Sequence, residues 1–212
     1  MIPISRLRKK YQPGRLTEKD LSSSPFRQFK NWFRNAVKAK LVAPNAMILA
    51  TASPDGKPSA RMVLLKGFDR RGFVFYTNYK SRKGRELSQN PHAALIFYWR
   101  ELERPVRITG LVKKVSRKES SEYFHSRPRE TQLGAWVSRQ SSVIENRAQL
   151  DRKLNQIRKK YRGKQVPLPP YWGGYRLSPN EFEFWRGVFN RLHDRLCYSK
   201  SNRHWNITRL SP

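Results

Sequence analysis

Two short apolar runs, separated by a turn and bounded by basic residues, constrain the fold of this chain more than any other feature. The first run is Met62-Val63-Leu64-Leu65 and the second is Phe73-Val74-Phe75-Tyr76. Between them lies Asp69-Arg70-Arg71-Gly72, a composition typical of a tight turn. Runs this short, rich in β-branched and aromatic residues, predict the two strands of an antiparallel hairpin.

The segment after the second run is predicted to bind a phosphate group. Ser81 is placed to cap a helix that begins with Arg82 and Lys83. A helix start offers free N–H groups and the positive end of the dipole, and here it adds two basic side chains. Tyr76 and Thr77 supply hydroxyl groups nearby in the sequence. Basic residues also begin helices by chance, so a solvated helix start stays an alternative.

The other apolar runs predict a mainly β fold with flanking helices. Strands are expected over 46–52, 93–99, 106–115, 174–177, 181–186, 191–198 and 204–210. Helices are expected over 24–37, 81–89, 116–125 and 146–161. Tight connections between most of the early strands favour a closed or partly closed antiparallel barrel. We expect one domain over 24–212, preceded by an N-terminal arm over 1–23.

The charge of the chain points to anionic partners. It has 45 Lys and Arg against 15 Asp and Glu, a net charge of +30, which favours polyanions or phosphorylated small molecules. The single cysteine, Cys197, cannot form an internal disulfide, and no Cys/His cluster has zinc spacing, so no metal is expected. No apolar run approaches the ~20 residues of a membrane span. We expect a cytoplasmic protein, with a transit peptide in the basic N-terminus as the alternative.

Three further clusters could contact anions. If 191–198 is a strand, Arg191, His193 and Arg195 share one face, which suits an anion opposite or a solvent-facing edge. Arg61 and Lys66 flank the first apolar run, either as anion contacts or as strand ends that reach into solvent. The third cluster joins Tyr123, Arg127 and Thr131, near which Gln140-Ser141 forms a weak loop signal. Acids are scarce, so a bound redox cofactor is favoured over carboxylate chemistry.

Seven stretches, taken together, resemble the pyridoxine (pyridoxamine) 5′-phosphate oxidase family. They are SARMVLLKGF, FYTNYKSRKG, YFHSRPRETQLGAWVSRQSS, VPLPPYWGGY, FEFW, NRLHDR and RLSP. Their order and spacing cover essentially the whole chain. The resemblance implies an antiparallel split β-barrel of the FMN-binding type, a homodimer, and FMN at the subunit interface.

The resemblance also implies roles for individual residues. FMN would be held by Arg61, Met62, Val63, Leu64, Leu65, Lys66, Tyr76, Thr77, Arg82, Lys83, Gln140, Ser141, Trp185 and Arg195. Substrate would be held by Arg8, Tyr11, Lys66, Tyr123, Arg127, Thr131, Arg191 and His193, with Arg191 and His193 as the catalytic pair.

The implied reaction is the oxidation of pyridoxine 5′-phosphate or pyridoxamine 5′-phosphate to pyridoxal 5′-phosphate. A hydride passes to the flavin, and dioxygen reoxidises the flavin and gives hydrogen peroxide.

Two residues depart from the family pattern. Pro105 stands where the family usually has a Gln that touches the flavin, and Thr131 replaces a usual Ser. We expect that FMN still binds but that the reactivity of the bound flavin is altered.

Two other functions stay open at this point. One is a split barrel that carries a flavin or vitamer with weakened catalysis, for which Pro105 is the suspect. The other is a basic nucleic-acid-binding module, but the aromatic residues lie in apolar runs rather than among the basic tracts. Nucleic acid is therefore expected to bind only nonspecifically, if at all.

Overall fold

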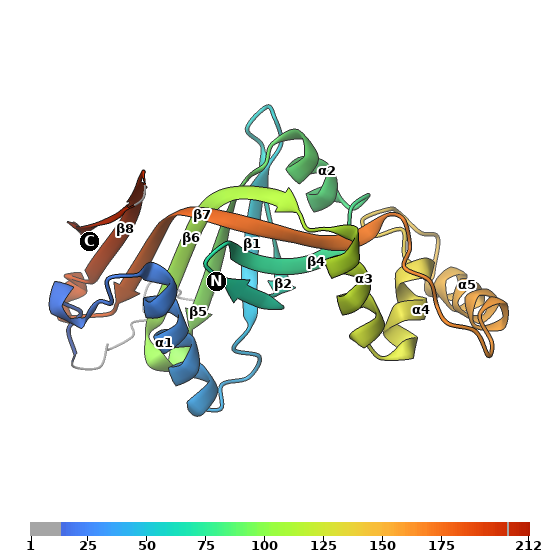
Figure 1. The fold of residues 1–212 in the computed structure, drawn as a ribbon, viewed down its shortest axis with the longest axis horizontal. Coiled ribbons are helices and arrows are strands. Elements are labelled where there is room, and N and C mark those ends of the chain that lie inside the picture. The colour runs from blue at the N-terminus through green and yellow to red at the C-terminus, as the bar shows by residue number, and fades with distance from the viewer. Residues whose placement is uncertain (1–13, 203) are drawn as a thin grey trace, which may run out of the picture. The chain divides into compact units, whose positions relative to one another are not determined.

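The structure is a computed structural model that describes residues 14–202 and 204–212 (Figure 1). Arg8, Tyr11 and most of the expected arm lie outside this part of the chain. The helices are α1 (Pro25–Lys38), α2 (Arg82–Gln89), α3 (Arg117–Ser126), α4 (Arg129–Val137) and α5 (Arg147–Lys160), with short 3-10 turns η2 (Glu18–Asp20), η3 (Arg100–Leu102) and η4 (Phe189–Arg191). The strands are β1 (Ala46–Ala52), β2 (Pro58–Leu64), β3 (Gly67–Asp69), β4 (Gly72–Asn78), β5 (His92–Trp99), β6 (Arg104–Lys114), β7 (Trp172–Arg186), β8 (Asp194–Ser201) and β9 (His204–Leu210).

The strands follow the order β2-β1-β5-β6-β7-β4-β3, with β8 paired to β7 and β9 paired to β8. The pairings of β4 with β3 and β7, and of β8 with β7 and β9, are antiparallel. The prediction of a mainly β fold with flanking helices is therefore confirmed. Within the described residues, no helix is long and apolar enough to cross a membrane.

Two compact units divide the chain. The first comprises residues up to Leu49, Ala94–Gly110 and Pro179–Pro212, and the second comprises Ala50–Ala93 and Leu111–Ser178. The boundaries between the units fall within β1, β5, β6 and β7.

Helix α1 forms part of the core of the first unit. It begins at Pro25, as the sequence predicts, because proline suits the first helical position. Phe29, Trp32 and Ala36 are buried, and the Phe29 ring meets Phe97 with centroids 4.9 Å apart. Val37, near the end of the same helix, is 50% exposed. The buried stripe therefore runs through Phe29, Trp32 and Ala36.

The predicted strand over 191–198 is wrong at its start. Phe189–Arg191 forms the turn η4, in which Asn190 and Arg191 have φ of 56° and 61°. Such left-handed backbone cannot continue a strand, so β8 begins only at Asp194. Arg191, His193 and Arg195 consequently do not line one face of a strand.

The two short strands predicted over 174–177 and 181–186 are one continuous strand, β7. Residues 172–177 pair with β4, and residues 181–186 pair with β8. Pro179 lies between the residues that pair with β4 and those that pair with β8. Its missing N–H therefore removes no hydrogen bond from either of these two pairings. The proline is therefore compatible with a strand that the sequence pattern divides.

A hairpin in the second unit confirms the predicted turn but not its first strand. Asp69 pairs with Gly72 around Arg70 and Arg71, so the strand before the turn is β3. The run Met62–Leu65 lies mostly in β2, which neighbours β1 in the sheet. Gly72 has φ of 137°, and a side chain there would collide with the carbonyl of Leu177. Glycine is therefore required at this turn.

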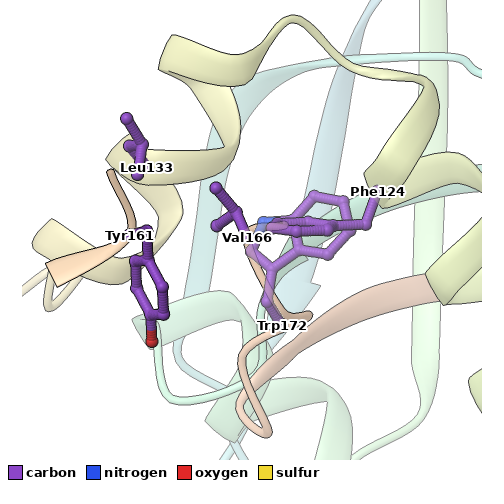
Figure 2. Close-up of a cluster of buried hydrophobic side chains, with 5 residues drawn as sticks. All are labelled: Phe124, Leu133, Tyr161, Val166 and Trp172. Atoms are coloured by element: carbon purple, nitrogen blue, oxygen red, sulfur yellow. The ribbon is translucent and has the colours of Figure 1, made fainter. Parts of the chain in front are cut away.

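A separate apolar cluster joins the helices of the second unit. Figure 2 shows Phe124 of α3 against Trp172 at the start of β7, with Val166 beside them. Leu133 of α4 and Tyr161, just after α5, complete the cluster. Helix α4 follows α3 directly and packs against α5 (Figure 1). This packing fixes α3 and α4 beside the first residues of β7.

Candidate functional site

A cavity of about 790 Å³ lies within the second unit. Strand, helix and loop residues line it: Met62, Val63, Leu64, Lys66, Tyr76, Thr77, Asn78, Lys83, Tyr123, Arg127, Pro128, Glu130, Thr131, Gly134, Ala135, Ser138, Gln140 and Trp172. Eleven of these residues carry predicted roles: Met62, Val63, Leu64, Lys66, Tyr76, Thr77, Lys83, Tyr123, Arg127, Thr131 and Gln140. Residues far apart in the sequence are therefore brought to one pocket, as the pattern of motifs requires.

Three stacked aromatic rings form one wall of the pocket. The Tyr76 ring lies 3.9 Å from the Tyr123 ring and 5.5 Å from the Trp172 ring, with interplanar angles of 19° and 12°. Tyr76 comes from β4, Tyr123 from α3 and Trp172 from β7. Burial raises the pKa of Tyr76 to about 12, so its hydroxyl stays protonated at neutral pH. The stack therefore brings an aromatic surface to the pocket, with no charge from Tyr76.

Arg127 lies against this wall with an unsatisfied donor. Its guanidinium carbon is 4.7 Å from the centre of the Trp172 ring and 5.8 Å from that of Phe124. The Nη1 atom is buried and has no hydrogen-bond partner. Burial also lowers the pKa of Arg127. A buried donor without an acceptor costs roughly 1–3 kcal/mol, so an anionic group at this position would be stabilising.

Lys66 and Thr131 contribute to the same end of the pocket. The Lys66 Nζ lies 5.9 Å from the centre of the Tyr123 ring, which is within cation–π range. The Thr131 hydroxyl donates to the Pro128 carbonyl at 2.6 Å. Both side chains are exposed.

Lys83 supplies a second positive charge to the pocket. Its Nζ donates to Gln140 Oε1 at 3.1 Å and to Thr77 Oγ1 at 3.4 Å, and Thr77 donates to the same Gln140 oxygen at 3.0 Å. Lys83 is only 7% exposed. Burial, followed by repulsion from Arg61, lowers the pKa of Lys83 to about 8. Ser81 caps the helix that carries Lys83 and accepts from Gly84 N–H at 3.2 Å, as predicted.

Arg61 and Arg82 do not line this pocket, because both bind the carboxylate of Glu86. Arg61 Nη2 donates to Glu86 Oε2 at 3.1 Å, and Arg82 Nε donates to Oε1 at 2.8 Å. Thr51 and Ser59 also donate to Oε2, at 2.5 and 2.6 Å. Burial opposes the ionisation of Glu86, but these hydrogen bonds outweigh it and lower its pKa to about 2.

No role was predicted from the sequence for Glu86, Asn78 or Trp172. Glu86 follows Arg82 by four residues, a spacing typical of ion pairs on a helix that could have indicated its role. Asn78 Nδ2 donates to the Ser138 carbonyl at 3.3 Å and thereby fixes the loop before Gln140. Leu65 and Ser141, both predicted to bind cofactor, do not line the pocket. Leu65 is buried in the core, and Ser141 is exposed in the loop after α4.

Four predicted site residues, and the departure at Pro105, belong to the first unit. His193 Nδ1 accepts from the Val188 N–H at 3.1 Å, so the neutral imidazole carries its proton on Nε2. The His193 ring lies 4.4 Å from that of Trp185. Burial and the charge of Arg191 lower the pKa of His193, which favours the neutral form. Arg195 Nε donates to Glu183 at 2.7 Å, and Arg191 is exposed in η4.

Comparison with known proteins identifies the family. Residues 33–161 match the family model described as pyridoxamine 5′-phosphate oxidase. The chain belongs to the pyridoxamine 5′-phosphate oxidase family. Residues 172–212 match a second model, described as the pyridoxine 5′-phosphate oxidase C-terminal dimerisation region. The resemblance stated from the motifs, and the expectation of an enzyme of this oxidase family, are both confirmed.

Curated relatives of the family match over almost the full chain. Those from Acaryochloris marina and Nostoc punctiforme are named pyridoxine/pyridoxamine 5′-phosphate oxidase. The first is 56% identical over 209 residues, which cover 99% of this chain and 95% of the relative. The second is 57% identical over 210 residues, which cover 99% and 98%.

Two solved structures share the fold. PhzG from Burkholderia lata, in complex with tetrahydrophenazine-1-carboxylic acid, superposes with a TM-score of 0.86 at 34% identity, over 92% of this chain and 95% of that one. A pyridoxamine 5′-phosphate oxidase-related, FMN binding protein from Nostoc punctiforme has a TM-score of 0.70 at 17% identity, over 91% and 100%. The second likeness concerns the fold alone, and it confirms the expected split-barrel class.

Proposed function

We propose that this protein is an FMN-dependent oxidase that converts pyridoxine 5′-phosphate or pyridoxamine 5′-phosphate to pyridoxal 5′-phosphate. The names of its full-length relatives support the substrates. The observation that carries the proposal is the pocket of the second unit, in which the cations Lys83 and Arg127 lie beside stacked aromatic rings. Two phosphorylated molecules need two such groups, whereas a single anionic ligand needs only one.

The residues present fit a bound flavin nucleotide. Lys83 is buried and, among the described residues, makes no ion pair, so a phosphate would supply the missing negative charge. Thr77 and Gln140 are already hydrogen-bonded to Lys83 and to each other. FMN would be held by the pocket residues Met62, Val63, Leu64, Lys66, Tyr76, Thr77, Lys83 and Gln140. The family pattern adds Arg61, Leu65, Arg82, Ser141, Trp185 and Arg195, which do not line this pocket.

The substrate phosphate would bind at the Arg127 end of the pocket. Arg127 offers the buried, unpartnered Nη1, and Lys66 adds a second charge. The Tyr123 and Thr131 hydroxyls would complete the phosphate contacts. Fixing the phosphate in this way limits how the ring at the other end of the substrate can move, which favours one reactive geometry.

Bound FMN would supply the hydride acceptor, with dioxygen as the final oxidant and hydrogen peroxide as the second product. The chain itself would position the substrate. We assign Arg191 and His193 to the pyridine ring of the substrate, where the Nε2–H of His193 can donate a hydrogen bond. The Val188 N–H holds the imidazole in that tautomer.

The dimerisation-region match over 172–212 supports a homodimer. The family pattern would place FMN at its subunit interface. A cytoplasmic location is part of the same proposal.

Flavin titration tests the proposed cofactor. The purified protein should bind one FMN per chain and show the yellow flavin absorbance band. Lys83→Gln should weaken FMN binding at least tenfold, because it removes the buried charge and keeps a polar side chain. A wild-type protein that stays colourless in excess FMN would refute the proposal.

A further inference from the structure

A separate cavity of about 270 Å³ lies wholly within the first unit. It is lined by Arg15, Leu16, Asp20, Gln28, Asn31, Trp32, Asn35, Arg104 and Arg186. Its side chains come from α1, the segment before α1, the start of β6 and the end of β7. None of these residues belongs to the pocket described above.

Two arginines of this cavity have buried donors without acceptors. The Nε atoms of Arg104 and Arg186 are both buried, and neither has a hydrogen-bond partner. Both arginines are only partly buried and line the cavity, so an acceptor in the cavity can contact their guanidinium groups. Folded proteins leave very few buried polar groups unpaired, so two in one cavity indicate a missing acceptor.

The charge of this cavity also lacks compensation. Among the described residues, neither Arg104 nor Arg186 forms an ion pair with a carboxylate. Asp20 is the acid in the lining, and its Oδ2 accepts from the Thr17 N–H and hydroxyl at 2.8 Å each. Burial and the charge of Arg186 lower the pKa of Arg104, as expected for two cations placed close together.

The surrounding side chains hold the two arginines in place. The Arg104 guanidinium carbon lies 5.0 Å from the centre of the buried Trp32 ring. A side chain at Gly14 would collide with the Arg186 guanidinium, so the main chain passes directly beside it. Gln28 accepts from the Ser22 N–H through Oε1, which leaves its NH₂ group as a donor. Asn31 and Asn35 add two more amides to the lining.

We propose that this cavity binds a small oxyanion of the phosphate class between Arg104 and Arg186. A tetrahedral dianion supplies several acceptor oxygens at once, and guanidinium groups bind such oxygens in pairs. The volume admits an inorganic phosphate or the phosphate end of a small phosphate monoester. This site is independent of the proposed oxidase function, because it shares no residue with the pocket of the second unit.

Binding in solution can be measured with the full chain carrying Arg127→Ala and Lys83→Gln, which weaken both anion sites of the other pocket. Inorganic phosphate is titrated by calorimetry, with chloride at matched ionic strength to correct for screening. Adding Arg186→Gln should raise the dissociation constant for phosphate at least tenfold. The matched control is Arg34→Gln, an exposed arginine on α1, which should change it less than twofold. Equal dissociation constants in the two variants would overturn the proposal.

A crystal experiment avoids the risk that Arg186→Gln or Arg104→Gln fails to fold. Crystals of the unmutated chain are soaked in selenate, and selenium is located by anomalous scattering. We expect a peak with oxygens about 3 Å from guanidinium nitrogens of both arginines. Selenium at Arg127 with none between Arg104 and Arg186 would refute the site.

Titration with glycerol phosphate shows whether the site takes a phosphate monoester or the free anion. Binding as tight as that of inorganic phosphate indicates a monoester, and weaker binding indicates the free anion.

Discussion

Arg61 of β2 and Glu86 of α2 are joined by an ion pair of 3.1 Å in the second unit. Arg82 binds the other carboxylate oxygen of Glu86 at 2.8 Å. The buried Glu86 carboxylate therefore orients two of the arginines that the family pattern assigns to FMN. Both arginines are held by the protein before any ligand arrives, which lowers the entropy cost of binding.

Replacing Glu86 with Gln should destabilise the protein by about 3 kcal/mol, because Arg61 would lose its buried counter-charge. Glu122→Gln, at an exposed position on α3, should be nearly neutral. Urea denaturation of both variants measures the difference.

The folded-state pKa of Glu86, about 2, lies below its ordinary value of 4.5. Its contribution is therefore complete above pH 4.5 and is lost as the pH falls towards 2. Glu86→Gln should remove stability at pH 6 but little at pH 2, and an equal loss at both would contradict this assignment.

FMN affinity should fall as the pH rises through 8, because the Lys83 ammonium loses its proton near that pH. A phosphate monoester is already doubly ionised above pH 7, so the change comes from the protein. Between pH 7 and pH 9 the dissociation constant should rise up to about tenfold. Lys83→Arg should flatten this dependence, since a guanidinium keeps its charge. Flavin fluorescence quenching measures both profiles, and a flat wild-type profile would exclude the role of Lys83.

Arg127→Ala should raise KM for pyridoxine 5′-phosphate by about 10- to 100-fold, the loss expected for a hydrogen bond to a charged group. FMN affinity should change little, since Lys83 and Gln140 hold the other cationic group. Arg152→Ala, an exposed arginine on α5, serves as the control. Steady-state kinetics at saturating FMN separates the two effects. Loss of FMN binding with KM unchanged would reverse the assignment of the two anion sites.

The pKa of His193 should lie below 6.5 in the folded protein and should rise in Arg191→Ala. Burial would still favour the neutral ring in that variant, but the repulsion from Arg191 would be gone. Nuclear magnetic resonance titration of the imidazole C–H signals measures both values. His193→Ala should lower turnover with FMN retained. An unchanged pKa in Arg191→Ala would show that the two side chains do not interact in solution.

Local sequence signals predicted the starts of two helices correctly. Ser81 caps α2 and Pro25 begins α1, because capping and proline preferences act within one turn of the chain. The alternating residue pattern predicted a strand at Arg191, but two successive residues there adopt left-handed backbone, which no spacing rule indicates. The same pattern predicted two strands where the structure has the single strand β7, because Pro179 resembles a strand end. Local spacing is therefore informative within an element but not about where a strand changes partner.

The candidate site was predictable in its residue types but not in its pairings. Lys83, Thr77 and Gln140 meet in one pocket, as the family pattern implies. Glu86 was missed because one acid in a basic segment resembles an ordinary surface residue. Its neutralising role becomes visible only when β1, β2 and α2 bring Thr51, Ser59 and Arg61 to its carboxylate.

The most direct test of the proposed function is product formation by the FMN-loaded protein under air. With pyridoxine 5′-phosphate as substrate, we expect pyridoxal 5′-phosphate and hydrogen peroxide in a one-to-one ratio. The rate should fall when Arg127→Ala replaces the wild type at a substrate concentration near the wild-type KM. An FMN-loaded wild-type protein that releases neither aldehyde nor peroxide from pyridoxine 5′-phosphate or pyridoxamine 5′-phosphate would contradict the assignment.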